Sequence, residues 1–128
     1  MTFKTSVATC FSKYVNFQGR ASRSEFWWFA LFVFLVYFIA IIIDDVTDQS
    51  IVQLIVDLAL FLPSLSVQAR RLHDIDKSGW WSLLGIIPLI GSIILLIMCT
   101  FEGTPGTNRF GESPLLVYEN SDTRLENN

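Results

Sequence analysis

The sequence predicts an all-α membrane protein with three transmembrane helices and an N-terminal amphipathic helix at the membrane interface. Three apolar stretches, at 26–43, 51–69 and 80–101, are each about as long as a membrane-spanning helix. Composition agrees, because 52% of the 128 residues are hydrophobic and 16% are charged, whereas soluble domains carry about 25% charge. We expect residues 1–118 to form a single membrane domain.

The first expected element is an interfacial helix over residues 2–18, ended by Gly19. Its apolar side chains recur at spacings of three and four, the period of a helix with one apolar face. They are Phe3, Val7, Cys10, Phe11, Tyr14 and Phe17. Such a helix lies either in the headgroup plane or against the protein's own spans, and both alternatives are open at this point.

The first span, 26–43, is an uninterrupted apolar run with arginines before it and aspartates after it. As a helix it would be nearly 30 Å long, roughly the thickness of the hydrocarbon core of a bilayer. A short polar turn, 44–50, separates it from the second span, 51–69. That second span is weaker, because it contains Asp57, Pro63 and several other polar residues.

The third span, 80–101, has no charged residue but contains the symmetric motif GIIPLIG at 85–91. Proline removes a backbone hydrogen bond and glycine permits a sharp turn, so the motif predicts a kink. We expect a single kinked crossing, and the alternative is a re-entrant hairpin that returns the chain to its starting side. A polar loop, 102–114, and a disordered tail, 119–128, follow.

The basic residues orient the predicted spans. Four Lys and Arg residues precede the first span and three follow the second, so seven of the nine in the chain lie on one side. Because Lys and Arg concentrate in cytoplasmic segments, this pattern predicts a cytoplasmic N-terminus. With three crossings the loop 102–114 and the C-terminus would be periplasmic, which would make Asn108 and Arg109 an outer loop motif.

Two polar motifs meet at the predicted cytoplasmic interface. They are GRASRSEFWW, at 19–28, and RRLHDIDKSGWW, at 70–81, and each joins basic residues to a tryptophan pair. The candidate cluster consists of Arg20, Arg23, Glu25, Arg70, Arg71, His73, Asp74 and Lys77. Its arginines either pair with the carboxylates to lock the helix ends or bind anionic lipid headgroups. Locking is the favoured interpretation.

Asp57 is the intramembrane polar candidate. It lies seven positions into the second span, about 10 Å from the surface. An ionised carboxylate at membrane depth is costly, so such residues often face the bundle interior and mark ion or proton sites. A hydrogen-bonded or protonated aspartate near the outer interface is the structural alternative.

We expect no catalytic residue, metal site or cofactor. His73 is the only histidine, and its neighbour Asp74 would not face it on a helix. A lipid-phosphate enzyme would require His73 and Arg70 to converge with Arg20 or Arg23. The net charge of −3 indicates no nucleic-acid partner.

Three segments together resemble the signatures of a bacterial inner-membrane family known as domain of unknown function 805. They are FQGRASRSEFWW at 17–28, RRLHDIDKSGWW at 70–81 and GTPGTNRFG at 103–111. The resemblance covers about residues 11–114, and the order of the motifs agrees. The family's last motif usually continues Gly-Pro-Asp-Pro, where this chain has GESP at 111–114. The resemblance implies a small bacterial inner-membrane protein and transfers no catalytic residue.

The function expected from these features is non-enzymatic. We expect an integral inner-membrane protein that interacts through its cytoplasmic face with membrane lipids, anionic headgroups in particular, or with a protein partner or further copies of itself. The alternative is a small transport or channel subunit that uses Asp57.

Overall fold

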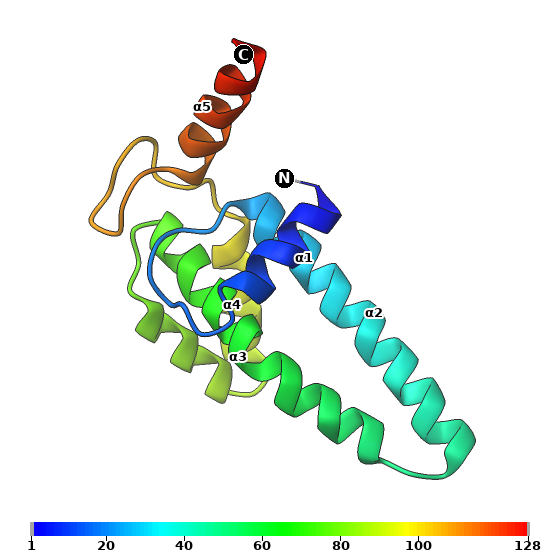
Figure 1. The fold of residues 1–128 in the computed structure, drawn as a ribbon. Helices are drawn as coiled ribbons and strands as arrows, with labels where there is room; N and C mark the ends of the chain where they lie inside the picture. The colour runs from blue at the N-terminus through cyan, green and yellow to red at the C-terminus, as the bar shows by residue number, and fades with distance from the viewer. Residues whose placement is uncertain (1, 128) are drawn as a thin grey trace.

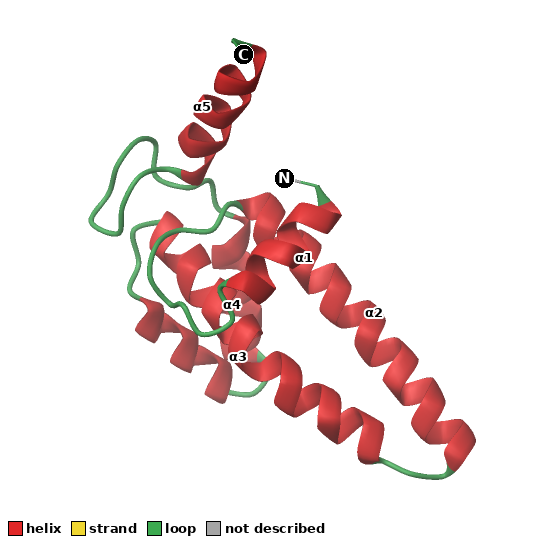
Figure 2. Ribbon diagram, in the orientation of Figure 1, coloured by secondary structure: helices red, strands yellow, loops and turns green. Residues whose placement is uncertain are grey.

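The computed structural model describes residues 2–127, and every regular element in that range is helical (Figures 1 and 2). The elements are α1 (Phe3–Ser12), α2 (Arg23–Thr47), α3 (Ile51–Asp74), the 3₁₀ helix η1 (Gly79–Ile86), α4 (Ile90–Thr100) and α5 (Pro114–Glu126). The predicted all-α class is therefore confirmed. Two helices, α2 and α3, are long and apolar enough to cross a membrane, and α4 is shorter.

A long hairpin of α2 and α3 forms the frame of the molecule (Figure 1). Both helices extend beyond the predicted apolar stretches into the polar residues at the arginine-rich end. At the other end, the N-cap Ser50 makes no side-chain cap for α3. The buried carboxylate of Asp44 replaces it, accepting hydrogen bonds from the N–H groups of Val52 (3.1 Å) and Gln53 (2.8 Å). This contact closes the hairpin.

The N-terminal segment is fastened to α3 around Pro63. Because proline has no N–H, it leaves the carbonyl of Ala59, four residues earlier, without its helical partner. The hydroxyl of Tyr14 donates to that carbonyl. The hydroxyl of Ser66 lies within hydrogen-bonding distance of two further backbone oxygens, of Lys13 (2.9 Å) and Asn16 (2.7 Å). The residues just after α1 are thus hydrogen-bonded to α3, at and around the backbone carbonyl that Pro63 leaves without a helical partner.

Packing on the protein's own spans is the alternative that the structure selects for α1. Cys10 is completely buried in a core cluster with Phe29, and the ring of Phe11 contacts the rings of Phe29 and Phe32 on α2. The helix ends at Ser12, earlier than the predicted residue 18, and the chain reaches α2 through a loop.

The prediction of a single crossing over 80–101 is wrong. The chain forms η1, turns through residues 87–89 and returns as α4, with Leu89 at a φ of +65°. After α4 it comes back to the point where it left α3, because the N–H of Thr104 donates to the carbonyl of Asp74 at 2.7 Å. The hairpin alternative describes this segment. Pro88 cannot continue a helix, and each arm is too short to span a bilayer.

The fold-back also corrects the placement of the loop 102–114. Its residues contact Arg20, His73 and Asp76 at the arginine-rich end, so this loop and the N-terminal motif lie on one side of the bundle. The predicted opposite placement is therefore wrong. Beyond the loop, α5 projects away from the bundle, and both chain ends lie at the same end of the molecule (Figure 1). Residues 119–128 were predicted to be a disordered tail, but residues 119–126 belong to the helix α5. Asn128 lies outside the described residues.

Candidate functional site

A buried charge network occupies the end of the bundle where α2 begins and α3 ends. Its members are three arginines and two carboxylates, each at most 6% exposed: Arg20, Glu25, Arg70, Arg71 and Asp74. All five belong to the cluster predicted from the two polar motifs. Burying five ionisable groups is costly unless each is paired, so their partners decide what the site can do.

Asp74 is the centre of the network because it binds two arginines at once. Its Oδ1 accepts from Nε of Arg20 at 2.8 Å, and its Oδ2 accepts from Nη1 of Arg71 at 2.5 Å. Arg71 lies one helical turn away, whereas Arg20 comes from the loop before α2. One carboxylate therefore joins that loop to the end of α3.

The remaining donors of the two arginines bond mainly to backbone carbonyls at the end of α4 and in the loop that follows it. Arg20 donates to the carbonyl oxygens of Thr104 (2.5 Å), Gly106 (2.6 Å) and Gly111 (3.1 Å). Arg71 donates to the carbonyl of Cys99 at 3.0 Å and to that of Phe101. These contacts hold the polar loop against the network and explain why it lies here.

Gly103 permits this loop to pass close to Asp74. A Cβ at position 103 would lie 2.1 Å from Oδ2 of Asp74, much closer than any normal contact. Gly103 lies in the motif GTPGTNRFG at 103–111, but that motif alone did not predict this contact. In the sequence, Gly103 is one of several glycines in a turn-rich segment. Such a glycine predicts a turn but does not indicate which side chain the backbone will lie against.

The second ion pair joins Arg70 to Glu25, which lies in the first turn of α2. Nη1 of Arg70 donates to both carboxylate oxygens, at 2.9 and 3.1 Å. Nε and Nη2 of Arg70 have no hydrogen-bond partner among the described residues. The thiol of Cys10 lies beside this pair, and burial, reinforced by the Glu25 charge, raises its pKa to about 12. The thiol is therefore protonated and unreactive at neutral pH.

His73 is held by the loop rather than by a catalytic partner. Its Nδ1 lies 2.9 Å from the carbonyl of Gly19, which can only accept, so Nδ1 carries the proton. Its ring stacks on Phe110, with centroids 4.0 Å apart and planes 4° from parallel. Asn108 donates from Nδ2 to the backbone oxygen of His73 at 2.9 Å. Asn108 and Phe110 thus cover the histidine.

Three basic residues of the predicted site lie outside the buried network. Arg23 and Lys77 are exposed, and neither has an ion pair within residues 2–127. Nζ of Lys77 lies 5.9 Å from the ring centroid of Trp81. Arg109 pairs with Asp76 at 3.2 Å, but both side chains are about half exposed (62% and 49%), so this pair contributes little to stability.

Two of these exposed bases, Arg23 and Lys77, are each close in sequence to an exposed tryptophan pair. Arg23 precedes Trp27 and Trp28, and Lys77 precedes Trp80 and Trp81. Tryptophan prefers the membrane interface, where its ring is buried and its N–H stays hydrated. We call Arg23, Lys77 and these four tryptophans the basic–aromatic rim.

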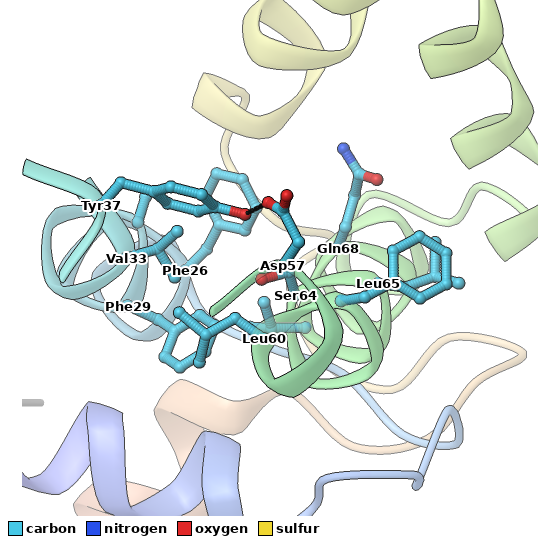
Figure 3. A pocket seen from close by; sticks show the side chains of 12 residues that line it. Phe26, Phe29, Val33, Tyr37, Asp57, Leu60, Ser64, Leu65 and Gln68 are labelled. Carbon is cyan, nitrogen blue, oxygen red and sulfur yellow. Dashed lines mark hydrogen bonds between the residues drawn. The ribbon is translucent and has the colours of Figure 1, made fainter. Parts of the chain in front are cut away.

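Asp57 lies apart from the network, in a groove between α2 and α3 (Figure 3). The groove has a volume of about 550 Å³ and is lined mainly by apolar side chains, with Ser64 and Gln68 towards the network end. The hydroxyl of Tyr37 donates to Oδ1 of Asp57. Asp57 is exposed at the groove surface and is the only charged residue within the three predicted spans.

Arg20 and Arg71 are bonded to Asp74 and to backbone carbonyls. Within the described range no group of three His, Cys, Asp or Glu residues is placed to hold a metal ion.

Comparison with known proteins adds the family context. The family described as "Protein of unknown function (DUF805)" matches residues 14–112. Inner membrane protein YhaH of Escherichia coli (strain K12) is 42% identical over 109 residues, covering 80% of this chain and 90% of that protein. Inner membrane protein YhaI of the same strain is 43% identical over 103 residues, covering 79% and 87%. No solved structure matches the chain.

Proposed function

Because the chain belongs to the DUF805 family, whose relatives include named inner membrane proteins, we propose that it is a non-enzymatic inner-membrane protein that binds anionic lipid headgroups at its cytoplasmic rim. The observation that carries this proposal is the separation of the basic residues in the two polar motifs into two sets. The buried arginines fasten the fold, whereas Arg23 and Lys77 are exposed beside interfacial tryptophans.

The orientation belongs to the proposal and follows from the fold-back of η1 and α4. All nine Lys and Arg residues lie before or at the start of α2, near the end of α3 or in the loop after it, or beyond α4. The turn between α2 and α3 has aspartates and no base. By the positive-inside rule we infer that both termini are cytoplasmic, with α2 and α3 as the full crossings within residues 2–127.

A reporter fused after Asn128 tests this topology. We expect green fluorescent protein at this position to fluoresce and alkaline phosphatase to be inactive, because the first folds in the cytoplasm and the second requires the oxidising periplasm. The same reporters placed after Asp48, in the α2–α3 turn, are the matched control and should give the opposite pattern. An active phosphatase at the C-terminus would show that the last segment crosses the membrane.

Removal of the two rim bases should weaken the preference for anionic lipid. We expect Arg23→Gln with Lys77→Gln to lower the relative affinity for phosphatidylglycerol over phosphatidylcholine several-fold, because a base near a membrane surface contributes about 1 kcal/mol. Quenching of tryptophan fluorescence by brominated lipids measures this ratio at the rim itself.

The matched control removes the same charge elsewhere. Arg109→Gln with Arg124→Gln also deletes two positive charges, but neither position adjoins a tryptophan pair. This variant should leave the lipid ratio close to that of the parent protein. Equal ratios for the parent and the rim variant would contradict the proposed lipid binding and would leave a protein partner as the alternative.

A further inference from the structure

The tip of the η1–α4 hairpin lies at a depth where exposed backbone is unfavourable. With 11 residues, α4 rises about 16 Å, about half of the hydrocarbon core. Residues 85–90 are all exposed, with Ile86 at 76% and Leu89 at 73%. Non-helical backbone at this depth is tolerated only when protein covers it or when it lines a water-filled cavity.

The same tip contains a helix end without a cap. The N-cap of α4 is Leu89, whose side chain cannot accept a hydrogen bond, and no other side chain caps the helix. The N–H of Ile90 donates to the carbonyl of Pro88 at 2.8 Å, whereas the N–H groups of Gly91 and Ser92 have no partner among residues 2–127. Such unpaired groups at a helix start carry a partial positive charge. The tip therefore presents hydrogen-bond donors and an apolar surface together.

The groove between α2 and α3 has the complementary features at the same depth. Counted along α3 from Arg71, Phe61 lies about 15 Å and Asp57 about 21 Å into the membrane, a range that includes the depth of the tip. Tyr37 occupies one carboxylate oxygen of Asp57, and the other has no hydrogen bond among residues 2–127. The rest of the deep groove is apolar, with Phe61 63% exposed.

We propose that a second copy of this chain covers this surface, with the hairpin tip of each copy seated in the α2–α3 groove of the other. Two copies related by a two-fold axis along the membrane normal bring groups of equal depth together. The uncapped end of α4 in one copy then lies at the depth of Phe61 in its partner, and the carboxylate of Asp57 lies about 5 Å deeper in the same groove. One chain contains both parts of the interface: the start of α4 supplies donors, and the α2–α3 groove supplies the acceptor. Two identical copies can therefore pair with each other.

This proposal is independent of lipid binding at the rim. The groove lies in the membrane interior, whereas Arg23 and Lys77 lie at its cytoplasmic end. A dimer with unchanged lipid preference, or a lipid-binding monomer, would separate the two proposals.

Oxidative cross-linking in native membranes tests the arrangement. Phe61→Cys and Leu89→Cys are placed on two differently tagged, co-expressed copies, and the heterodimer is detected after copper–phenanthroline treatment. The native Cys10 and Cys99 are buried, so the tagged parent gives the background. The matched control is Leu58→Cys with Leu89→Cys, because Leu58 is 71% exposed on α3 at nearly the same depth but does not line the groove.

We expect the Phe61–Leu89 pair to cross-link and the Leu58–Leu89 pair to remain at background. Equal cross-linking of both pairs would indicate random collision and would overturn the proposal. Absence of the first cross-link in variants whose thermal unfolding matches the parent would also overturn it, as would a monomer in single-molecule photobleaching. In that case a lipid or water would cover the tip.

A second variant tests the role of the carboxylate. Asp57→Asn keeps the size and the Tyr37 partner but removes the charge near the helix end. We expect the dissociation constant of the dimer in nanodiscs to rise about tenfold, as for loss of a partly buried charge at a helix terminus. An unchanged constant would show that Asp57 does not contribute to the interface.

Discussion

Replacing Asp74 by alanine is expected to lower the free energy of unfolding by about 3–5 kcal/mol, because it leaves two buried arginines without their carboxylate. The side chains of Arg20 and Arg71 are 1% and 0% exposed in their pairs with Asp74. Both guanidinium groups would stay charged in a site with no other carboxylate bound to them. Denaturant unfolding of the purified protein in micelles, followed by tryptophan fluorescence, measures the change.

Asp76→Ala is the matched control for this experiment. Asp76 lies two residues away and also pairs with an arginine, but that pair is exposed. We expect a loss of at most about 1 kcal/mol, since exposed ion pairs contribute little. Similar losses for the two variants would mean that Asp74 does not organise the buried network.

Replacing Gly91 by alanine is the second change with a large expected effect. A Cβ there would lie 1.7 Å from the carbonyl oxygen of Leu84 and 2.7 Å from its carbonyl carbon, so η1 and α4 would have to separate. Overfilling a core where side chains can move costs about 1–3 kcal/mol. Here the neighbour is backbone, and we expect a loss at or above the upper end of that range in the same unfolding measurement.

Gly85→Ala provides the comparison within the same hairpin. A Cβ at position 85 would meet only the flexible Cδ1 of Leu95, at an ordinary 3.6 Å. We expect a change within about 1 kcal/mol, as for glycine-to-alanine exchange in an exposed helix. Equal effects at positions 85 and 91 would contradict the close approach of η1 and α4.

Local sequence patterns were sufficient to predict the long helices α2 and α3 and the members of the buried charge network. The uninterrupted apolar run predicted α2. The charged motifs, one before the first span and one after the second, predicted that Arg20, Glu25, Arg70, Arg71 and Asp74 would meet at one interface. The structure brings these five together. It leaves Arg23 and Lys77 outside, because exposure depends on which way a side chain points at a helix start or in a turn, and spacing alone does not determine that direction.

The path after α3 was the part that local patterns could not decide. The motif GIIPLIG at 85–91 is compatible with both a kinked crossing and a hairpin, and the length of the apolar stretch favoured the crossing. What selects the hairpin lies elsewhere in the chain: the backbone oxygens around residues 99–111 satisfy the donors of Arg20 and Arg71. Every residue has a backbone carbonyl, so no residue pattern shows which carbonyls will accept these hydrogen bonds.

By itself, the sequence determined the helical class, the inner-membrane family and the composition of the charge cluster, because periodicity, segment length and residue type report these directly. Only the tertiary structure decided that η1 and α4 double back, that the loop 102–114 lies on the network and that the segment after α1 binds α3 at the carbonyl freed by Pro63. These features depend on backbone groups that meet across distances of up to about ninety residues, where hydrogen-bond satisfaction in a buried site outweighs local preference.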